Sequence, residues 1–279
     1  MITHPKLSAP YPRFAAFLLA TVTVANAAPI FNETFDGLTT GELNGQNGWT
    51  ANTGEGTVIE SGGLSYSAGD FVINGGDKSL VFGTGNTDAT LDFYKSIGSQ
   101  SGSSTSIYWS YTIRINSVGN GDVFFLGVDG TNNWSSGFAG SGDASASAAA
   151  WGTRLNGANV NNAITYSTGQ TYFIVVGIDN SGSGSGGNYD KISVWINPTT
   201  TVAGTATITR DLTTFTTNMT NFGLARAGSV SLDANIDNIV VGQSFAEVTG
   251  LYAIPEPSTY ALIVGMASIA GAALRRRRR

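Results

Sequence analysis

The 279-residue chain contains no cysteine and a single histidine, His4. Without cysteine the fold has no disulfide bond, so its stability depends on a packed core. His4 lies at the extreme N-terminus, ahead of the part expected to fold. That part therefore has no Ser-His-Asp triad, no thiol nucleophile, and no zinc or iron site built from His or Cys. What remains is the chemistry of carboxylates, of tyrosine or lysine bases, and of calcium bound through oxygen atoms.

The chain also has little long-range apolar patterning outside its two ends. At the N-terminus, Lys6 and Arg13 precede the apolar stretch 14–24, which runs into Ala25-Asn26-Ala27. A positive region, a short apolar core and a small-x-small site are typical of a secretory signal peptide. We expect residues 1–27 to be this signal, cleaved after Ala27, with Ala28 as the neighbouring alternative.

The C-terminus has three parts in order. Pro255, Glu256 and Pro257 lead into the apolar run 258–274, which is followed by Arg275, Arg276, Arg277, Arg278 and Arg279. As an α-helix the run would reach roughly 26 Å, the short edge of what a hydrocarbon core of about 30 Å needs. The arginines favour a cytoplasmic C-terminus by the positive-inside rule. On these residues alone, a simple tail anchor and a processing signal are both open.

This order of Pro-Glu-Pro, a short apolar helix and an arginine cluster resembles the PEP-CTERM sorting signal of Gram-negative bacteria. The resemblance covers residues 254–279. It implies recognition by an exosortase, a membrane-embedded transpeptidase-like enzyme, near the Pro-Glu-Pro. It also implies a connection with exopolysaccharide production and biofilm formation. The expected route is secretion, a membrane-anchored intermediate with a cytoplasmic C-terminus, and then the cell surface or extracellular matrix.

Positive charge is scarce between the two signals. That region keeps 18 acidic and 7 basic residues, a formal net charge of −11. Such a surface repels nucleic acid and anionic lipid, so no nucleic-acid partner is expected.

The same region alternates between apolar and polar residues. In residues 107–116, Ile107, Trp109, Tyr111, Ile113 and Ile115 share one face, which predicts a half-buried antiparallel strand. Further strands are predicted at 57–60, 63–67, 79–82, 91–95, 123–128, 172–179, 189–197 and 236–241. Short strands with Gly-, Ser- and Asn-rich connections favour an all-β fold, a two-sheet antiparallel jelly-roll sandwich. We expect one domain over residues 28–253.

Three short motifs resemble concanavalin A-like and laminin-G-like jelly rolls. They are Asn32–Asp36, Val194–Pro198 and Ile236–Gly242. The resemblance implies that the last strand lies beside the first. Residues 32–35 and 237–241 should therefore be neighbours.

Carboxylates show no closely spaced pattern of the kind that glycosidases of this fold use. Asp88 and Asp92 are four residues apart, as are Asp233 and Asp237, but both pairs adjoin turn-like residues. Turn and surface roles are therefore expected. The protein is predicted to be no enzyme and to need no cofactor.

Calcium is an alternative in two loops, at Asp129-Gly130-Thr131-Asn132-Asn133 and at Asp179-Asn180. Both offer oxygen ligands, although Asp and Asn also favour turns.

Sugar binding is open at three tryptophans. Trp49, Trp134 and Trp151 lie among Gly, Ser and Asn, where an exposed ring could stack on a sugar or simply anchor a loop. Trp109 and Trp195 lie on predicted strands and are expected in the core.

The leading hypothesis is a non-enzymatic, structural or adhesive protein of the polysaccharide matrix. Its expected partners are the secretion machinery, an exosortase-type enzyme and extracellular polysaccharide. A lectin-like domain that binds a glycan, with or without calcium, is the alternative, and a polysaccharide-degrading enzyme is the third hypothesis.

Overall fold

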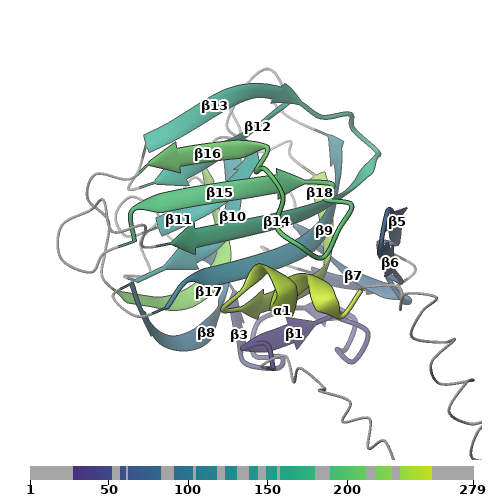
Figure 1. Ribbon diagram of the computed structural model, residues 1–279. Coiled ribbons are helices and arrows are strands. Elements are labelled where there is room, and N and C mark those ends of the chain that lie inside the picture. Colours follow the sequence, from purple (N-terminus) through teal and green to yellow (C-terminus); the bar gives the residue numbers. More distant parts are fainter. Residues whose placement is uncertain are drawn as a thin grey trace, which may run out of the picture.

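The chain folds into two stacked antiparallel sheets, seen in the computed structural model of Figure 1. The structure describes residues 28–51, 57–60, 62–82, 91–102, 105–117, 123–130, 138–143, 149–155, 158–179, 189–211, 218–227 and 233–252. The predicted signal peptide and transmembrane helix lie outside these residues. Among the described helices, none is long and apolar enough to cross a membrane.

Sheet A orders its described strands β16-β15-β14-β9-β18-β7-β4-β2, and β1 also pairs with β18. Their bounds are β16 (Ile208–Asp211), β15 (Lys191–Ile196), β14 (Thr171–Asp179), β9 (Ile107–Ser117), β18 (Asp233–Gly242), β7 (Lys78–Phe82), β4 (Thr57–Glu60), β2 (Gly41–Glu42) and β1 (Phe31–Glu33).

Sheet B orders its described strands β13-β12-β11-β10-β17-β8-β3. Their bounds are β13 (Ala158–Thr165), β12 (Ala150–Leu155), β11 (Phe138–Asp143), β10 (Val123–Asp129), β17 (Asn218–Ala227), β8 (Leu91–Ser101) and β3 (Trp49–Ala51). The small hairpin of β5 (Tyr66–Ala68) and β6 (Phe71–Ile73) stands apart from both sheets. The all-β sandwich predicted from the alternating pattern is confirmed.

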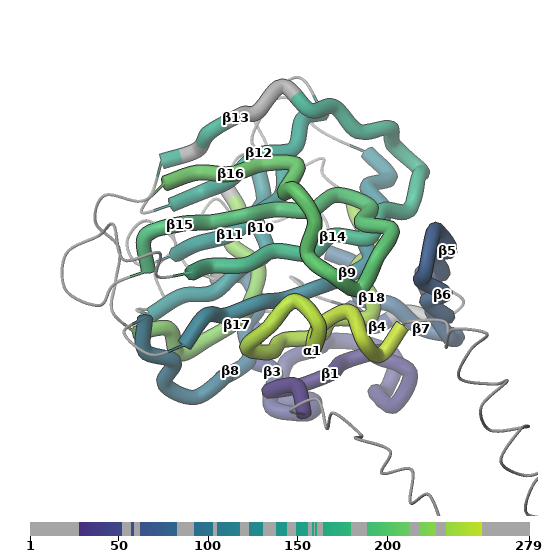
Figure 2. The backbone as a smooth tube through the Cα atoms, viewed as in Figure 1, coloured from purple at the N-terminus to yellow at the C-terminus, as the bar shows by residue number. Residues whose placement is uncertain are grey.

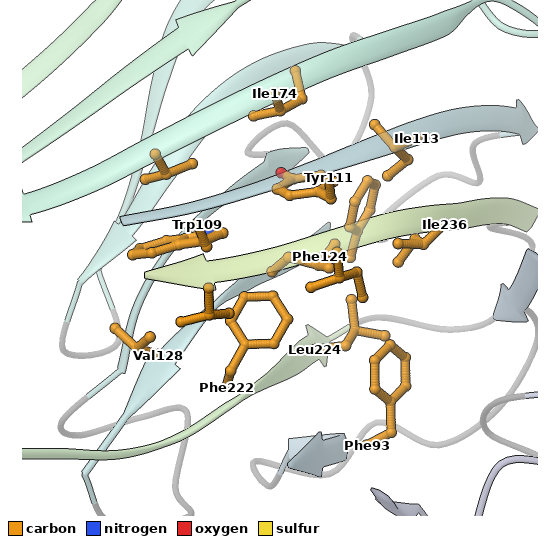
Figure 3. Close-up of a cluster of buried hydrophobic side chains, with 14 of the residues drawn as sticks. Phe93, Trp109, Tyr111, Ile113, Phe124, Val128, Ile174, Phe222, Leu224 and Ile236 are labelled. Atoms are coloured by element: carbon orange, nitrogen blue, oxygen red, sulfur yellow. The ribbon is translucent and has the colours of Figure 1, made fainter. Parts of the chain in front are cut away.

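The main core fills the space between the sheets. Trp109, Tyr111 and Ile113 project from β9 and meet Phe222 and Leu224 from β17, as Figure 3 shows. These side chains are at most 1% exposed, and each buried large apolar group contributes about 1.5–3 kcal/mol. The alternation in 107–116 therefore correctly predicts which side chains of β9 point into the space between the two sheets.

The first strand pairs with the last, as the resemblance to jelly rolls implies. Phe31 lies opposite Val241, Asn32 opposite Val240 and Glu33 opposite Ile239. On the same side of β18, residues 234–236 pair with β7, while β9 pairs along the other side. Strand β18, the last strand of the body, thus fixes its first strand, β1, to sheet A.

Strand β9 is buried on both faces, which corrects its half-buried prediction. Ser110 and Thr112, on the supposedly solvent-facing side, are 0% exposed. The short helix α1 (Phe245–Gly250) lies over this face, and the Ser110 hydroxyl donates to the carbonyl oxygen of Val248 at 2.7 Å. A polar residue on this face of β9 is therefore buried beneath α1 and forms a hydrogen bond with its backbone.

The predicted strand at 63–67 is displaced. Residues 62–65 are not in a strand, and β5 begins only at Tyr66. Gly63 explains this, because a Cβ atom there would overlap the backbone of Gly75. The backbones around Gly63 and Gly75 lie too close together to accommodate a side chain at either position. Strand β4 pairs with β7 instead.

Candidate functional site

The Trp49 ring belongs to the core and offers no face to a sugar. It is 1% exposed and packs edge-on against Phe31 and Phe93, with ring centroids 6.0 and 5.6 Å apart. Its indole N–H donates to Glu33 Oε2 at 3.0 Å. The same carboxylate oxygen lies 3.6 Å from the Lys95 ammonium nitrogen, so this tryptophan anchors the N-terminal segment.

The Trp151 ring is buried as well, in the same core but toward the opposite edge of sheet B. It is 1% exposed, and its ring centroid lies 5.1 Å from that of Tyr166 and 5.6 Å from that of Tyr172. The Tyr166 hydroxyl in turn donates to the buried Asp143 carboxylate at 2.7 Å. Trp134 lies outside the described residues.

The other two tryptophans occupy different layers. Trp109 is fully buried between the sheets, as expected. Trp195, 9% exposed, packs on the outer face of sheet A, with its ring centroid 5.0 Å from that of Phe245 in α1.

Two of the four singled-out aspartates are buried, which corrects the expected turn and surface roles. Asp92 is 1% exposed and forms an ion pair with Arg226, in which Arg226 Nε lies 2.9 Å from Asp92 Oδ2. Asp237 is 0% exposed. Asp233 is half-buried at the start of β18, and Asp88 lies outside the described residues. The buried Asp92 and Asp237 therefore belong to the framework of the fold.

Asp237 sits at a β-bulge in β18. Asp237 pairs with Thr112 and Val240 with Ser110, so two residues on β18 oppose one on β9. Asn238 has φ 53°, in the left-handed region where asparagine is one of the tolerated residues. Its side-chain amide donates to the carbonyl oxygen of Leu64 at 3.1 Å. The Asp-Asn pair thus bends the strand and secures the segment before β5.

The Asp237 carboxylate accepts the backbone N–H groups of Leu64 and Asn238, at 3.0 and 2.7 Å. Burial raises the pKa of Asp237 to about 8, and the nearby Asp36 and Glu33 carboxylates add to the increase. The backbone N–H groups offset part of it. Burial thus favours the protonated form of this carboxyl group well above the pH at which an exposed aspartate ionises.

The two calcium loops are only partly described. Asp129 is fully buried at the end of β10, and its carbonyl oxygen accepts the Thr220 hydroxyl at 3.4 Å. The Asp179 carboxylate oxygens accept the Tyr108 hydroxyl, at 3.2 and 3.3 Å. Within the described part of the chain, no three His, Cys, Asp or Glu residues are grouped so as to hold a metal ion. Residues 131–133 and Asn180 lie outside that part.

A shallow polar pocket of about 500 Å³ opens beside β1. It is lined by Asn32, Glu33, Thr34, Gly37, Leu38, Thr39, Gln46 and Asn47. Its one carboxylate, Glu33, already accepts the side chains of Asn47 and Trp49. The Gln46 side chain likewise bonds to the backbone of Thr39, so the polar groups of this pocket serve to close the N-terminal loop.

The feature that connects the body with the predicted sorting segment is a clamp on the outer face of sheet A. Helix α1 begins at the N-cap Ser244, whose hydroxyl accepts the N–H of Glu247 at 3.2 Å. Glu247 accepts in return the N–H of Gln243 at 2.8 Å, which resembles a capping box. Phe245 and Val248 then pack into an apolar cluster with Phe173, Val175, Trp195, Val240, Phe71 and Ile73.

Tyr252 is the last described residue and completes the clamp. Its ring packs edge-on against Phe173, with centroids 5.8 Å apart, and its hydroxyl donates to the carbonyl oxygen of Asn238 at 3.0 Å. Its own carbonyl oxygen accepts the N–H of Val72 in β6 at 3.0 Å. Burial raises the pKa of the Tyr252 phenol, which stays neutral and able to donate. The chain is thus held to the body up to residue 252.

Directly beyond this clamp, residues 253–279 match the PEP-CTERM protein-sorting motif. No curated protein matches the chain.

Three solved structures illustrate its likeness in fold. An endo-β-1,4-glucuronan lyase from the fungus Trichoderma reesei is 14% identical, with 79% of this chain and 98% of that one covered and a TM-score of 0.45. The alginate lyase Aly36B is 16% identical, with coverage of 77% and 98% and a TM-score of 0.42. The globular domain of T. cruzi calreticulin is 14% identical, with coverage of 80% and 92% and a TM-score of 0.48.

The observations define a class. The protein is a two-sheet antiparallel β-sandwich that carries a PEP-CTERM sorting signal at its C-terminus. That signal implies export through a membrane-anchored intermediate and processing by an exosortase-type membrane enzyme. The resemblance on which Pro255, Glu256 and Pro257 were singled out is confirmed at the level of the motif.

Proposed function

We propose that the protein is a non-enzymatic surface or matrix component, sorted by an exosortase-type enzyme and used for a structural or adhesive role in extracellular polysaccharide. The observation that carries this proposal is the sorting motif at 253–279, which begins one residue after the clamped Tyr252. The folded body is then cargo, delivered first to the membrane and afterwards to the cell surface or matrix. The C-terminal arginines stay in the cytoplasm until processing.

The chemistry of the described residues supports a non-catalytic role. The described acids and rings that were candidates for catalysis or sugar stacking hold the fold: Asp92 pairs with Arg226, Asp237 bonds to backbone N–H groups, and Trp49 bonds to Glu33. With its sole histidine in the predicted signal peptide, the body also lacks the commonest general acid–base residue.

The experiment that tests sorting is an intact-mass measurement on protein recovered from the surface of an exosortase-bearing host. We expect a mature chain that begins at Ala28 and has lost Arg275–Arg279. The matched control replaces Pro255 and Pro257 by alanine, which keeps the apolar run and the arginines, and it should retain the tail. A wild-type chain that keeps its full tail would favour simple anchoring instead.

A second assay separates an adhesive role from sugar recognition and catalysis. Purified protein is incubated with neutral and acidic polysaccharides while binding and new chain ends are both measured. Turnover of any polysaccharide would contradict the non-enzymatic role. Tight binding to one glycan that Trp134→Ala abolishes, with an unchanged melting temperature, would favour the lectin-like alternative. Calcium enters that alternative only if calcium raises the melting temperature and a chelator reverses the rise.

A further inference from the structure

Large apolar side chains are exposed at four positions among the described residues. Val72 is 52% exposed, Val202 75%, Leu251 52% and Val160 36%. Val160 lies in the edge strand β13 of sheet B. The other three belong to segments that contact one another, namely the β5–β6 hairpin, the loop between β15 and β16, and the end of α1.

Two backbone hydrogen bonds join these segments. The Val72 N–H donates to the carbonyl oxygen of Tyr252 at 3.0 Å, and the Asp70 N–H donates to that of Thr199 at 2.8 Å. Gly69, at the hairpin turn, has φ 56° and packs directly against the backbone of Thr199. The hairpin and the end of α1 accordingly lie at the same end of the molecule (Figure 2). We call this surface, with Val72, Val202 and Leu251 upon it, the exit face.

The exit face is also almost free of charge. Across its three segments, residues 61–76, 192–209 and 248–252, Asp70 is the one ionisable acid or base of the Asp, Glu, Lys and Arg types. The body as a whole carries 18 acidic residues against 7 basic ones. These segments are therefore poor in charge compared with the body as a whole, and they lie where the chain leaves for its sorting segment.

The sequence beyond Tyr252 limits how far this face can stand from a membrane. Five residues, 253–257, separate Tyr252 from Ser258, where the apolar run begins. Even fully extended, a linker of this length spans no more than roughly 20 Å.

We propose that in the membrane-anchored intermediate the exit face lies on the lipid bilayer, with Val72, Val202 and Leu251 in its headgroup layer. The inference rests on the proposed function, because it requires the apolar run to be inserted. Contact with lipid removes three exposed apolar side chains from water, and the neutrality of the face avoids the repulsion that the rest of the body would feel from anionic lipid. The body is thereby oriented, and the Pro-Glu-Pro segment is kept at the membrane surface, where a membrane-embedded enzyme can reach it.

The absence of cysteine makes the test direct. Val72→Cys, Val202→Cys and Leu251→Cys each create a single labelling site in the full-length chain, and Val160→Cys is the matched control on a distant strand. Each labelled protein is reconstituted into phosphatidylcholine vesicles that contain a lipid with a brominated acyl chain. We expect quenching of the fluorescent label at positions 72, 202 and 251 to exceed that at position 160 by about twofold or more, because side chains in the headgroup layer approach the acyl chains.

A membrane-extraction control and a cross-linking measurement accompany the quenching experiment. Resistance to alkaline carbonate extraction reports insertion of the tail separately from the position of the body. If the tail is inserted and positions 72, 202 and 251 are quenched no more than position 160, the proposal is overturned. A disulfide between two copies at position 202, formed without lipid quenching, would overturn it in favour of a second copy of the chain. If the tail is extracted, the anchored intermediate fails, and this inference fails with it.

Discussion

At the residue scale, the raised pKa of the buried Asp237 leads us to expect that the stability of the sandwich depends on pH. The pKa of Asp237 is raised to about 8 by burial and by the nearby Asp36 and Glu33 carboxylates, whereas in the unfolded chain it returns to its ordinary value of 3.8. Between these values the folded state binds a proton that the unfolded state does not. This contribution to the free energy of unfolding therefore decreases as pH rises from about 4 to 8, by at most about 1.4 kcal/mol per pH unit.

The prediction is that Asp237→Asn flattens this dependence. The amide has the shape of the carboxyl group and cannot ionise, so the melting temperature of the variant should not fall between pH 5 and pH 9 as that of the wild type does. Its NH2 group faces one of the two backbone N–H groups that the carboxylate accepts, so the variant loses one of these hydrogen bonds at every pH. Thermal melts from pH 5 to 9 measure the difference. Asp233→Asn, a change in the same strand at a half-buried position, should follow the wild-type curve. Parallel curves for Asp237→Asn and the wild type would contradict the assignment.

Trp49 gives a second prediction. Trp49→Phe keeps an aromatic ring but removes the N–H that donates to Glu33, and it leaves part of the indole volume empty. We expect a loss of about 1–3 kcal/mol in the free energy of unfolding, measured by denaturant titration with an unchanged slope. Val160→Ala, at an exposed position, should change it by less than about 0.5 kcal/mol.

At the level of residues, the sequence predicted Trp109 correctly because its neighbours alternate cleanly. Trp49 follows Gly48 and precedes Thr50, and Trp151 precedes Gly152, so both looked like loop residues. Their burial depends on partners more than ten residues away, Glu33 for Trp49 and Tyr166 for Trp151. The residues next to each tryptophan in the sequence do not reveal contacts with such distant partners.

At the level of elements, three of the strands that the sequence did not reveal contain glycine where a neighbouring strand passes or pairs closely. β11, β12 and β17 contain Gly140, Gly142, Gly152 and Gly223, and Gly142 lies directly opposite Gly152. Glycine ordinarily marks turns, so Phe138–Asp143 appeared to be a connection. At Gly142 and Gly223 a Cβ atom would overlap the backbone of the neighbouring strand, so glycine is required there by close approach. The strands with aromatic and β-branched residues, such as β9, β10 and β14, were predicted.

This account of the glycines predicts a specific sensitivity. Gly142→Ala places a methyl group against the carbonyl oxygen of Phe124, within the sheet, where the backbone cannot yield easily. The expected loss is about 1–3 kcal/mol in the free energy of unfolding. Gly204→Ala, with nothing within 4 Å of the added Cβ, is the control and should be nearly neutral. Equal effects of the two substitutions in denaturant titrations would refute the close-approach argument.

Helix α1 is short and depends on its cap. Ser244→Ala removes the hydroxyl that accepts the N–H of Glu247 and should lower the free energy of unfolding by about 0.5–2 kcal/mol. Hydrogen exchange should accelerate at Val248 and Tyr252 before it does in β9. Ala246→Ser, an exposed change within the helix, is the control. Unchanged exchange at Val248 in Ser244→Ala would show that packing alone holds the helix.

At the level of the whole molecule, the clamp determines where the body ends. A chain that stops after Tyr252 keeps the apolar cluster on sheet A intact, whereas one that stops after Gly242 loses Phe245, Val248 and Tyr252 from it. We expect the longer chain to melt like the body of the full-length protein. The shorter should be destabilised by at least about 3 kcal/mol, or about 6–12 °C. Equal melting temperatures would mean that α1 is dispensable.

The pairing of β1 with β18 also sets the order of events during secretion. A chain that crosses a membrane from its N-terminus delivers Phe31 first, yet the partner of Phe31 is Val241, 210 positions later. Sheet A therefore cannot close until nearly the whole body has crossed, and contacts between such distant residues form slowly. On the proposed route, the apolar run at 258–274 would by then be entering the bilayer. The last strand would then pair while the chain is held at the membrane, where diffusion into encounters with other unfinished copies is restricted.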